Sequence, residues 1–293
     1  MKAGIIGGTG KMGQLFVPVL ERAGYEVLVT GRSTALTNAD LAQQCELVIV
    51  SVPIRDTVRV IGEIAPLLAR NQLLCDLTSL KARPVEAMLK SKANVVGLHP
   101  MFGPTVGSLK SQTIIVCPAR VEERLLHNLV AVFRKEGARC TMTTPAEHDK
   151  MMAVVQGLTH YVTLCMADSI RRLGMDIEAT KEFTSPVYQI ELSLVGRLLS
   201  QDPDLYADIL QQHLDYVPNV ARRAGVSTVP VTVACINCAW AGSAEKAHEE
   251  NSTAICSVLG QRILLFLKQI ILDGGCRLQT SLSKTWPPLY EKQ

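Results

Sequence analysis

Residues 97–104 (GLHPMFGP) place a histidine at the end of an apolar stretch that reads as a β-strand, ahead of a stiff loop of proline and glycine. An imidazole has an ordinary pKa of about 6.5, so His99 can accept a proton from an alcohol near neutral pH. The pattern indicates a general base at the carboxyl end of a strand. A loop histidine that only makes structural bonds is the alternative interpretation.

A polar loop, Asp76-Leu-Thr-Ser-Leu-Lys81, leaves another apolar strand earlier in the chain. The hydroxyl of Ser79 would orient the imidazole of His99 and fix its tautomer, and Lys81 would bind an anion. Considered alone, the segment is an ordinary polar loop between a strand and a helix.

Two further residues lie in apolar, helical stretches of the second half. His160 is flanked by apolar residues, where a histidine is more often a hydrogen-bonded core residue than a catalyst. Arg197 lies near the end of an apolar helix face and requires an anionic partner, which is Glu191, Asp202 or a substrate carboxylate.

The first residues of the chain contain a nucleotide-binding pattern. A short apolar strand, 1–7, runs into G-x-G-x-x-G and then into an apolar helix, 14–23. The glycines allow a tight turn, the close approach of a pyrophosphate and tight packing of helix on strand, so phosphates meet N–H groups at the helix N-terminus. The residues expected to contact a dinucleotide here are Gly8, Thr9, Gly10, Lys11, Met12 and Gly13.

The end of the second strand, 25–30, indicates which dinucleotide is bound. Enzymes that prefer NAD carry an acidic residue near this point, where this chain has Gly31, Arg32, Ser33 and Thr34. A guanidinium with nearby hydroxyls favours the 2′-phosphate of NADP, although NAD stays possible and an ordinary polar loop would have a similar composition.

Apolar strands alternate with helices through the first half, which predicts an α/β fold: a doubly wound parallel sheet of the Rossmann type. We expect this domain to span 1–143 and a mainly α-helical domain to span 144–293. Beyond about residue 212 the composition shifts, and that tail is atypical.

Composition excludes several classes of function. A net charge of +3 with scattered basic residues does not indicate nucleic acid, and the chain has no apolar run of membrane-spanning length and no signal peptide. We therefore expect a cytoplasmic protein. The nine cysteines lie mostly in apolar runs, and the pair Cys235 and Cys238 lacks the partners of a metal site, so free thiols and no metal are expected.

The chain resembles the prephenate dehydrogenases, in particular the dehydrogenase part of bifunctional chorismate mutase/prephenate dehydrogenases. The resemblance covers about residues 2–211. It rests on IIGGTGKMGQLF from Ile5, VIVSVPI from Val48, D-L-x-S-x-K from Asp76, GLHPMFGP from Gly97, EHDKMM from Glu147, TSPVYQIELSLVGRL from Thr184 and QDPDLYADI from Gln201.

This resemblance implies oxidative decarboxylation of prephenate to 4-hydroxyphenylpyruvate in tyrosine biosynthesis. His99 would take the proton of the C4 hydroxyl, Ser79 would support His99, Arg197 would hold a substrate carboxylate, and His160 would lie beside the substrate. The other residues expected at the site are Lys81 and Gln189 on the substrate, and Val52 and Pro53 beside the cofactor. Members are homodimers joined through the helical domain.

Departures from the family pattern qualify these expectations. No mutase segment precedes the first strand, Gln189 stands where related enzymes usually have arginine, and the tail does not match the family's last helices. A divergent tail would mean altered assembly, lower activity or a change of reading frame. The alternatives to a prephenate dehydrogenase are an arogenate dehydrogenase and a non-catalytic, dinucleotide-sensing binding protein.

Overall fold

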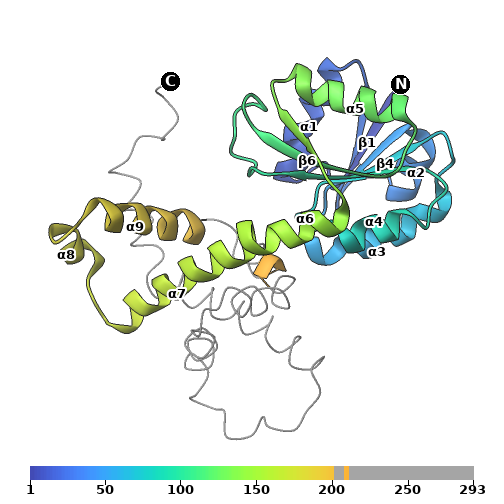
Figure 1. Cartoon of the computed structure of the whole chain (residues 1–293). Helices are drawn as coiled ribbons and strands as arrows, with labels where there is room; N and C mark the ends of the chain where they lie inside the picture. Colours follow the sequence, from blue (N-terminus) through green and yellow to red (C-terminus); the bar gives the residue numbers. More distant parts are fainter. Residues whose placement is uncertain (201–207, 211–293) are drawn as a thin grey trace, which may run out of the picture. The chain divides into compact units, whose positions relative to one another are not determined.

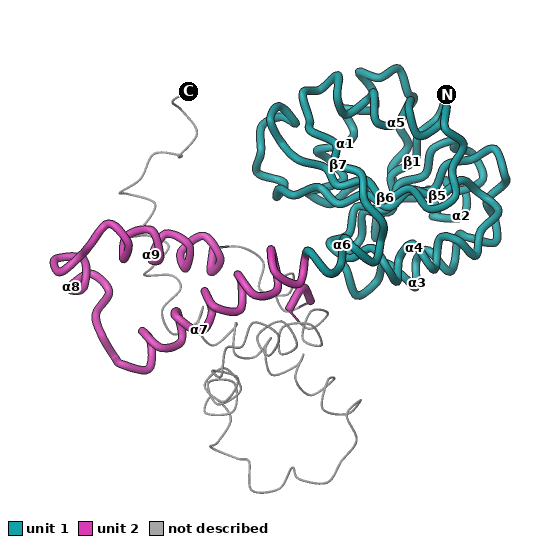
Figure 2. Tube along the Cα trace, in the orientation of Figure 1, with its two compact units in different colours: residues 1–151 teal, residues 152–293 magenta. Residues whose placement is uncertain are grey.

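The computed structural model describes residues 1–200 and 208–210. The chain divides by its internal contacts into a first unit, Met1–Met151, and a second unit that begins at Met152 (Figures 1 and 2). The boundary expected from the sequence lies earlier, after residue 143, and stays a prediction. The atypical tail lies outside the described residues.

The first unit is built on one sheet whose strand order is β2-β1-β3-β4-β5-β6-β7. Its strands are β1 (Lys2–Ile6), β2 (Glu26–Thr30), β3 (Leu47–Val50), β4 (Leu73–Asp76), β5 (Asn94–Pro100), β6 (Thr113–Arg120) and β7 (Arg139–Met142). The first five are paired in parallel. The strand order reverses between β1 and β3, and such a switch point at the carboxyl ends of the strands is where α/β sheets bind ligands.

The sheet is not parallel throughout, because β6 pairs antiparallel with β5 and parallel with β7. A parallel partner for β5 would need a crossover connection, usually a helix. Residues 101–112 contain no helix, so the chain returns along β5 in the opposite direction. The expected doubly wound fold is confirmed, with this antiparallel edge as the difference.

Helices cover both faces of the sheet (Figure 1). They are α1 (Lys11–Arg22), α2 (Asn38–Gln44), α3 (Ile54–Ile64), the 3₁₀ turn η1 (Ala65–Leu67), α4 (Ala82–Met88), α5 (Glu123–Lys135) and α6 (Pro145–Met152). One core packs α1 and α5 on the sheet, and the other packs α2, α3 and α4 on the opposite face.

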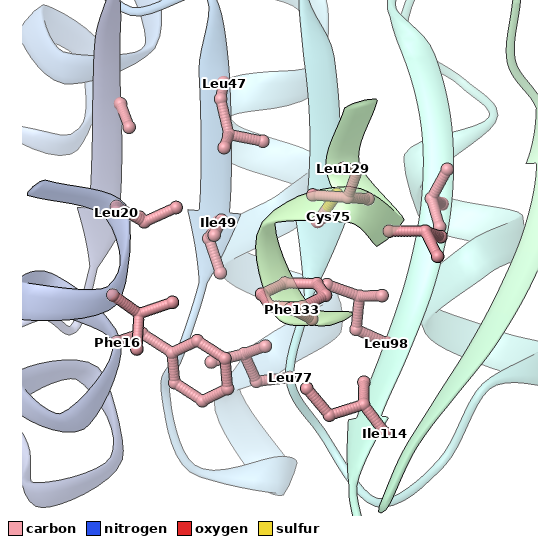
Figure 3. Close-up of a cluster of buried hydrophobic side chains, with 14 of the residues drawn as sticks. Phe16, Leu20, Leu47, Ile49, Cys75, Leu77, Leu98, Ile114, Leu129 and Phe133 are labelled. Carbon is pink, nitrogen blue, oxygen red and sulfur yellow. The ribbon is translucent and has the colours of Figure 1, made fainter. Parts of the chain in front are cut away.

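Spacing of apolar residues explains the first of these cores. Phe16, Val19 and Leu20 recur at the helical interval along α1 and are all buried. The ring of Phe16 meets the ring of Phe133 of α5 edge to face, with centroids 6.0 Å apart (Figure 3). This contact fixes α1, and with it the glycine loop, over the sheet.

The second unit is helical where it is described. Its elements are the π-helical segment η2 (Ala153–Leu158), α7 (Thr159–Arg172), α8 (Ile177–Glu182) and α9 (Pro186–Leu199). Leu164 and Ala167 of α7 pack against Val195 and Leu198 of α9. Among the described residues, no helix is long and apolar enough to cross a lipid bilayer.

Candidate active site

The glycine loop between β1 and α1 has the geometry of an anion cradle. The first hydrogen bond of α1 runs from Gln14 N to Gly10 O, so the preceding N–H groups of the first turn have no partner in the helix. A Cβ on Gly13 would lie 2.5 Å from Gly8 Cα, which no side chain can tolerate. These features fit the pyrophosphate of a dinucleotide.

A further glycine, Gly7, was missed by the sequence reasoning. Its φ of +79° lies in the left-handed region, and a Cβ there would lie 2.3 Å from the carbonyl oxygen of Ser51. The end of β1 therefore lies directly against the segment that follows β3. Half-buried Val52 and exposed Pro53, both expected beside the cofactor, belong to that segment.

The loop after β2 begins with Gly31, and a side chain at that position would have to displace the side chain of Thr9. A Cβ on Gly31 would lie 2.0 Å from Thr9 Oγ1. The hydroxyl of Thr34 accepts a hydrogen bond from Gly31 N at 3.0 Å and is thus held inside the turn. Arg32 and Ser33 are exposed, and no ion pair joins Arg32 to any residue in the described part of the chain.

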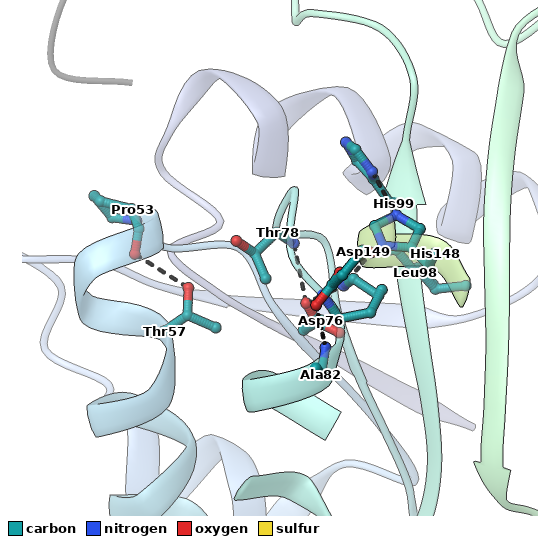
Figure 4. Close-up of polar contacts among 10 residues, drawn as sticks. Pro53, Thr57, Asp76, Thr78, Ala82, Leu98, His99, His148 and Asp149 are labelled. Atoms are coloured by element: carbon teal, nitrogen blue, oxygen red, sulfur yellow. Dashed lines mark hydrogen bonds and ion pairs between the residues drawn. The ribbon is translucent and has the colours of Figure 1, made fainter. Parts of the chain in front are cut away.

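His99 lies at the carboxyl end of β5 and is buried, with 2% of its surface exposed. Its Nδ1 is 2.9 Å from Nε2 of His148, and Nδ1 of His148 is 2.8 Å from Oδ1 of Asp149 (Figure 4). Both partners belong to α6, which begins directly after the last strand. The structure thus places a continuous line of imidazole, imidazole and carboxylate at this edge of the sheet.

Asp149 is held by backbone as well as by His148. Its two oxygens accept hydrogen bonds from the N–H groups of Lys81 (2.8 Å) and Ala82 (2.9 Å), which begin α4. Desolvation raises the pKa of this carboxyl, but the hydrogen bonds from His148, Ala82 and Lys81 outweigh it, and the pKa is lowered. Asp149 is therefore ionised near neutral pH.

The expectation that Lys81 binds a substrate anion needs correction. Its side chain is fully buried, and Nζ bonds the carboxylate of Asp76 and, at 2.6 Å, the carbonyl oxygen of Leu98. Burial raises the pKa of Asp76, and the ammonium of Lys81 opposes that rise. The ammonium thus compensates a buried carboxylate and ties β4 to β5.

The expected link between Ser79 and His99 is also absent. Ser79 is half-buried in the loop after β4, and within the described residues no hydrogen bond joins it to His99. Nδ1 of His99 instead lies 2.9 Å from Nε2 of His148. Ser79 stays a predicted site residue, but the structure does not support its expected role of orienting the imidazole of His99.

The remaining predicted residues belong to the second unit. His160 is half-buried on α7, while Gln189 and Arg197 are exposed on α9. No ion pair joins Arg197 to Glu191, and the other protein partner considered, Asp202, lies outside the described residues. The part of the chain that the structure describes holds no group of three or more potential metal ligands.

Comparison with known proteins identifies matches along most of the chain. The family model for the nucleotide-binding domain of prephenate dehydrogenase matches residues 26–142, and the model for its dimerization domain matches residues 144–222. A probable arogenate/prephenate dehydrogenase from Methanocaldococcus jannaschii is 37% identical over 224 residues, covering 70% of this chain and 50% of the relative. A T-protein from Enterobacter agglomerans is 39% identical over 207 residues, covering 70% and 55%.

Solved structures share the fold. A prephenate dehydrogenase from Aquifex aeolicus, in complex with hydroxyphenyl propionate and NAD+, superposes with a TM-score of 0.63 at 18% identity, over 90% of this chain and 98% of that one. The arogenate dehydrogenase of Synechocystis has a TM-score of 0.61 at 16% identity, over 83% and 94%. This chain spans about half the length of the curated relatives that it matches. With both family models matching in succession, the chain belongs to the prephenate dehydrogenase family.

Proposed function

We propose that this protein is a dehydrogenase that oxidatively decarboxylates prephenate to 4-hydroxyphenylpyruvate and prefers NADP+ as the hydride acceptor. The observation that carries the proposal is the buried His99, held by His148 and Asp149 at the same edge of the sheet as the glycine cradle. Family membership supports the substrate class.

The protein's own groups would handle binding and proton transfer. His99 would accept the proton of the C4 hydroxyl, and Arg197 would form a charge-assisted contact with a substrate carboxylate. The bound nicotinamide would supply the acceptor for the C4 hydride. Loss of the ring carboxylate as CO2 then gives an aromatic ring, which drives the reaction.

Three features around β2 support the preference for NADP+. A side chain in place of Gly31 would clash with the side chain of Thr9, and exposed Arg32 and Ser33 follow it directly. A guanidinium can pair with a 2′-phosphate as a fork of two hydrogen bonds. We expect Arg32→Ala to lower kcat/KM for NADP+ by about tenfold to a hundredfold, since a hydrogen bond to a charged group contributes about 1.5–3 kcal/mol.

The control for this variant is NAD+ itself, which lacks the 2′-phosphate. Arg32→Ala should leave kcat/KM for NAD+ nearly unchanged, so the ratio of the two cofactors reports the contact. Equal losses with both cofactors would contradict a role of Arg32 in 2′-phosphate binding.

An arogenate dehydrogenase is the second candidate, favoured by Gln189. This exposed residue stands where related enzymes usually have arginine, so the helix carries one positive charge fewer. Arogenate bears an ammonium in place of the side-chain carbonyl of prephenate, and a lost cation would ease its acceptance. Gln189→Arg should therefore shift preference towards prephenate.

The deciding experiment follows reduced nicotinamide by absorbance, with each substrate and each cofactor, on the purified chain. Reduction with prephenate and NADP+ supports the proposal, and reduction with arogenate alone favours the second candidate. His99→Asn should lower kcat by about a hundredfold or more, because proton transfer contributes about 10²–10⁴-fold. No reduction with either substrate would favour a dinucleotide-sensing binding protein.

A homodimer is part of the proposal, because residues 144–222 match a dimerization domain. Light scattering during size-exclusion chromatography tests it. A single species at the monomer mass across the working concentration range would exclude it.

A further inference from the structure

We propose that His148 is a positioning residue for His99, and that His148 with Asp149 takes up the proton that His99 receives. The inference rests on the proposed dehydrogenase reaction and adds two residues to it. Its basis is one unbroken line of contacts, from Nδ1 of His99 to Nε2 of His148 (2.9 Å) and from Nδ1 of His148 to Oδ1 of Asp149 (2.8 Å).

The direction of the hydrogen bonds follows from Asp149. An ionised carboxylate only accepts, and this one accepts from two backbone N–H groups as well as from His148. The proton of neutral His148 must therefore lie on Nδ1. Its Nε2 then carries a lone pair and can only accept, which requires His99 to donate from Nδ1.

This assignment gives His99 the tautomer that a base needs. With the proton of the neutral ring on Nδ1, the lone pair of His99 lies on Nε2. The carboxylate of Asp149 thus fixes the tautomer of His148, and His148 in turn fixes the tautomer of His99. Ser79, expected to do this, makes no hydrogen bond to His99 within the described residues.

The same line of contacts provides a route for the proton. When the O–H bond of the substrate breaks, a new N–H bond forms at Nε2 of His99. The proton on Nδ1 of His99 then passes to Nε2 of His148, so His99 is neutral again and His148 is an imidazolium beside the carboxylate of Asp149. Two protons each move by one step, the net change is one positive charge on His148, and nothing is oxidised or reduced in this transfer.

Charge and burial favour the final state. The side chain of His148 is fully buried and that of Asp149 is 11% exposed, so water screens their attraction poorly. Among the described residues, the neighbouring charged pair is Lys81 with Asp76, and its ammonium is bound by that carboxylate and by the carbonyl oxygen of Leu98. The carboxylate that contacts His148 and balances a cation on it is that of Asp149.

Two substitutions at His148 separate its two roles. A glutamine oxygen can still accept a hydrogen bond from Nδ1 of His99 but cannot take the proton, whereas phenylalanine does neither. We expect His148→Gln to lower kcat by about tenfold and His148→Phe by about a hundredfold or more, within the range that general base catalysis contributes. Affinity for the cofactor should not change in either variant.

The pH profile distinguishes this role from a packing role. In His148→Gln the protonated base has lost its stabilisation by Asp149, so the acidic limb of kcat/KM should move to lower pH. Glu147→Gln is the matched control, a change at a half-buried neighbour on the same helix whose carboxylate pairs with exposed Lys150, and it should leave rate and profile unchanged. An unchanged limb and rate in His148→Gln would overturn the proposal.

A second measurement does not need turnover. Nitrogen NMR of isotope-labelled histidine in the unliganded, full-length protein should show His99 and His148 both protonated on Nδ1, with coupled titrations. An Nε2–H tautomer of neutral His99, or independent titrations, would overturn the proposal even in an active enzyme. If the wild type reduces no cofactor with either substrate, the proposed function fails, while the NMR result still decides whether the pair is built as described.

Discussion

Among single residues, Arg197 has the most distinct expected effect. It is exposed on α9, and no ion pair joins it to any other residue that the structure describes. We predict that Arg197→Ala raises KM for the substrate by about tenfold to a hundredfold with a small change in kcat. The reason is that the substitution removes a charge-assisted contact of about 1.5–3 kcal/mol.

Steady-state kinetics with varied substrate measures this effect. Arg197→Lys is the control, because it keeps the charge but loses the planar fork, and it should give an intermediate KM. A drop in kcat at unchanged KM would place Arg197 in the chemical step instead.

Asp149 also has a predicted effect on stability. The pKa of Asp149 is lowered in the folded state. Its contribution to the free energy of unfolding is therefore fully present above the unfolded pKa of about 3.9, and it is lost as the pH falls through the lower pKa of the folded state. The difference in unfolding free energy between wild type and Asp149→Asn should therefore be largest near neutral pH and shrink in acid. Urea titrations at a series of pH values measure it, and a constant difference would contradict the assigned hydrogen bonds.

At the residue scale, the sequence predicted His99 as a site residue but did not predict its partners, His148 and Asp149. His148 lies far along the chain from His99, and neither residue type nor spacing shows that the fold brings the rings together. His148 and Asp149 belong to the run EHDKMM, which resembles the family pattern. That resemblance is the feature of the sequence that could have indicated them as site residues. Lys81 was misplaced because sequence cannot tell whether an ammonium meets a ligand or the carboxylate of Asp76.

Among the elements, the turn from β1 into α1 tolerates no added methyl group. A Cβ on Gly13 would lie 2.5 Å from Gly8 Cα and 2.7 Å from Gly7 O, both backbone atoms. Gly13→Ala should therefore distort the loop and weaken cofactor binding by at least about tenfold, as measured by fluorescence titration. Overpacking of this kind typically costs about 1–3 kcal/mol.

The matched control is another helical glycine, Gly62 of α3, whose Cβ would meet nothing within 4 Å. Gly62→Ala should stabilise the protein by about 0.4–1 kcal/mol through helix propensity and unfolded-state entropy, with unchanged cofactor binding. Equal cofactor affinity in both variants would show that the loop can relax.

Strands were the elements that the sequence predicted best, because buried parallel strands are continuous apolar runs. The helix α2 was missed: it has only one short apolar face, and its signal is a capping box in which Thr37 and Asp40 bond each other's backbone. The antiparallel pairing of β6 with β5 was also not predicted, because an apolar run does not indicate whether a strand pairs parallel or antiparallel with its neighbour.

For the whole molecule, the reactivity of buried cysteine thiols tests whether the protein stays folded. Burial raises the pKa of Cys45 to about 11 and that of Cys117 to about 12, and it raises the pKa of Cys75 further. We predict that iodoacetamide at mildly alkaline pH leaves these three unmodified until the protein unfolds, as mass spectrometry of peptides can show. Rapid alkylation under native conditions would mean that the first unit opens readily.

The placement of His148 on a helix makes chain length critical just before it. Pro145 begins α6, and the bond from His148 N to Thr144 O starts its first turn. One inserted residue after Ala146 would rotate everything downstream by about 100° and shift it by about 1.5 Å, which turns the imidazole away from His99. Variants of this protein should therefore accept substitutions at these positions more readily than insertions or deletions, so chain length is constrained here as well as residue identity.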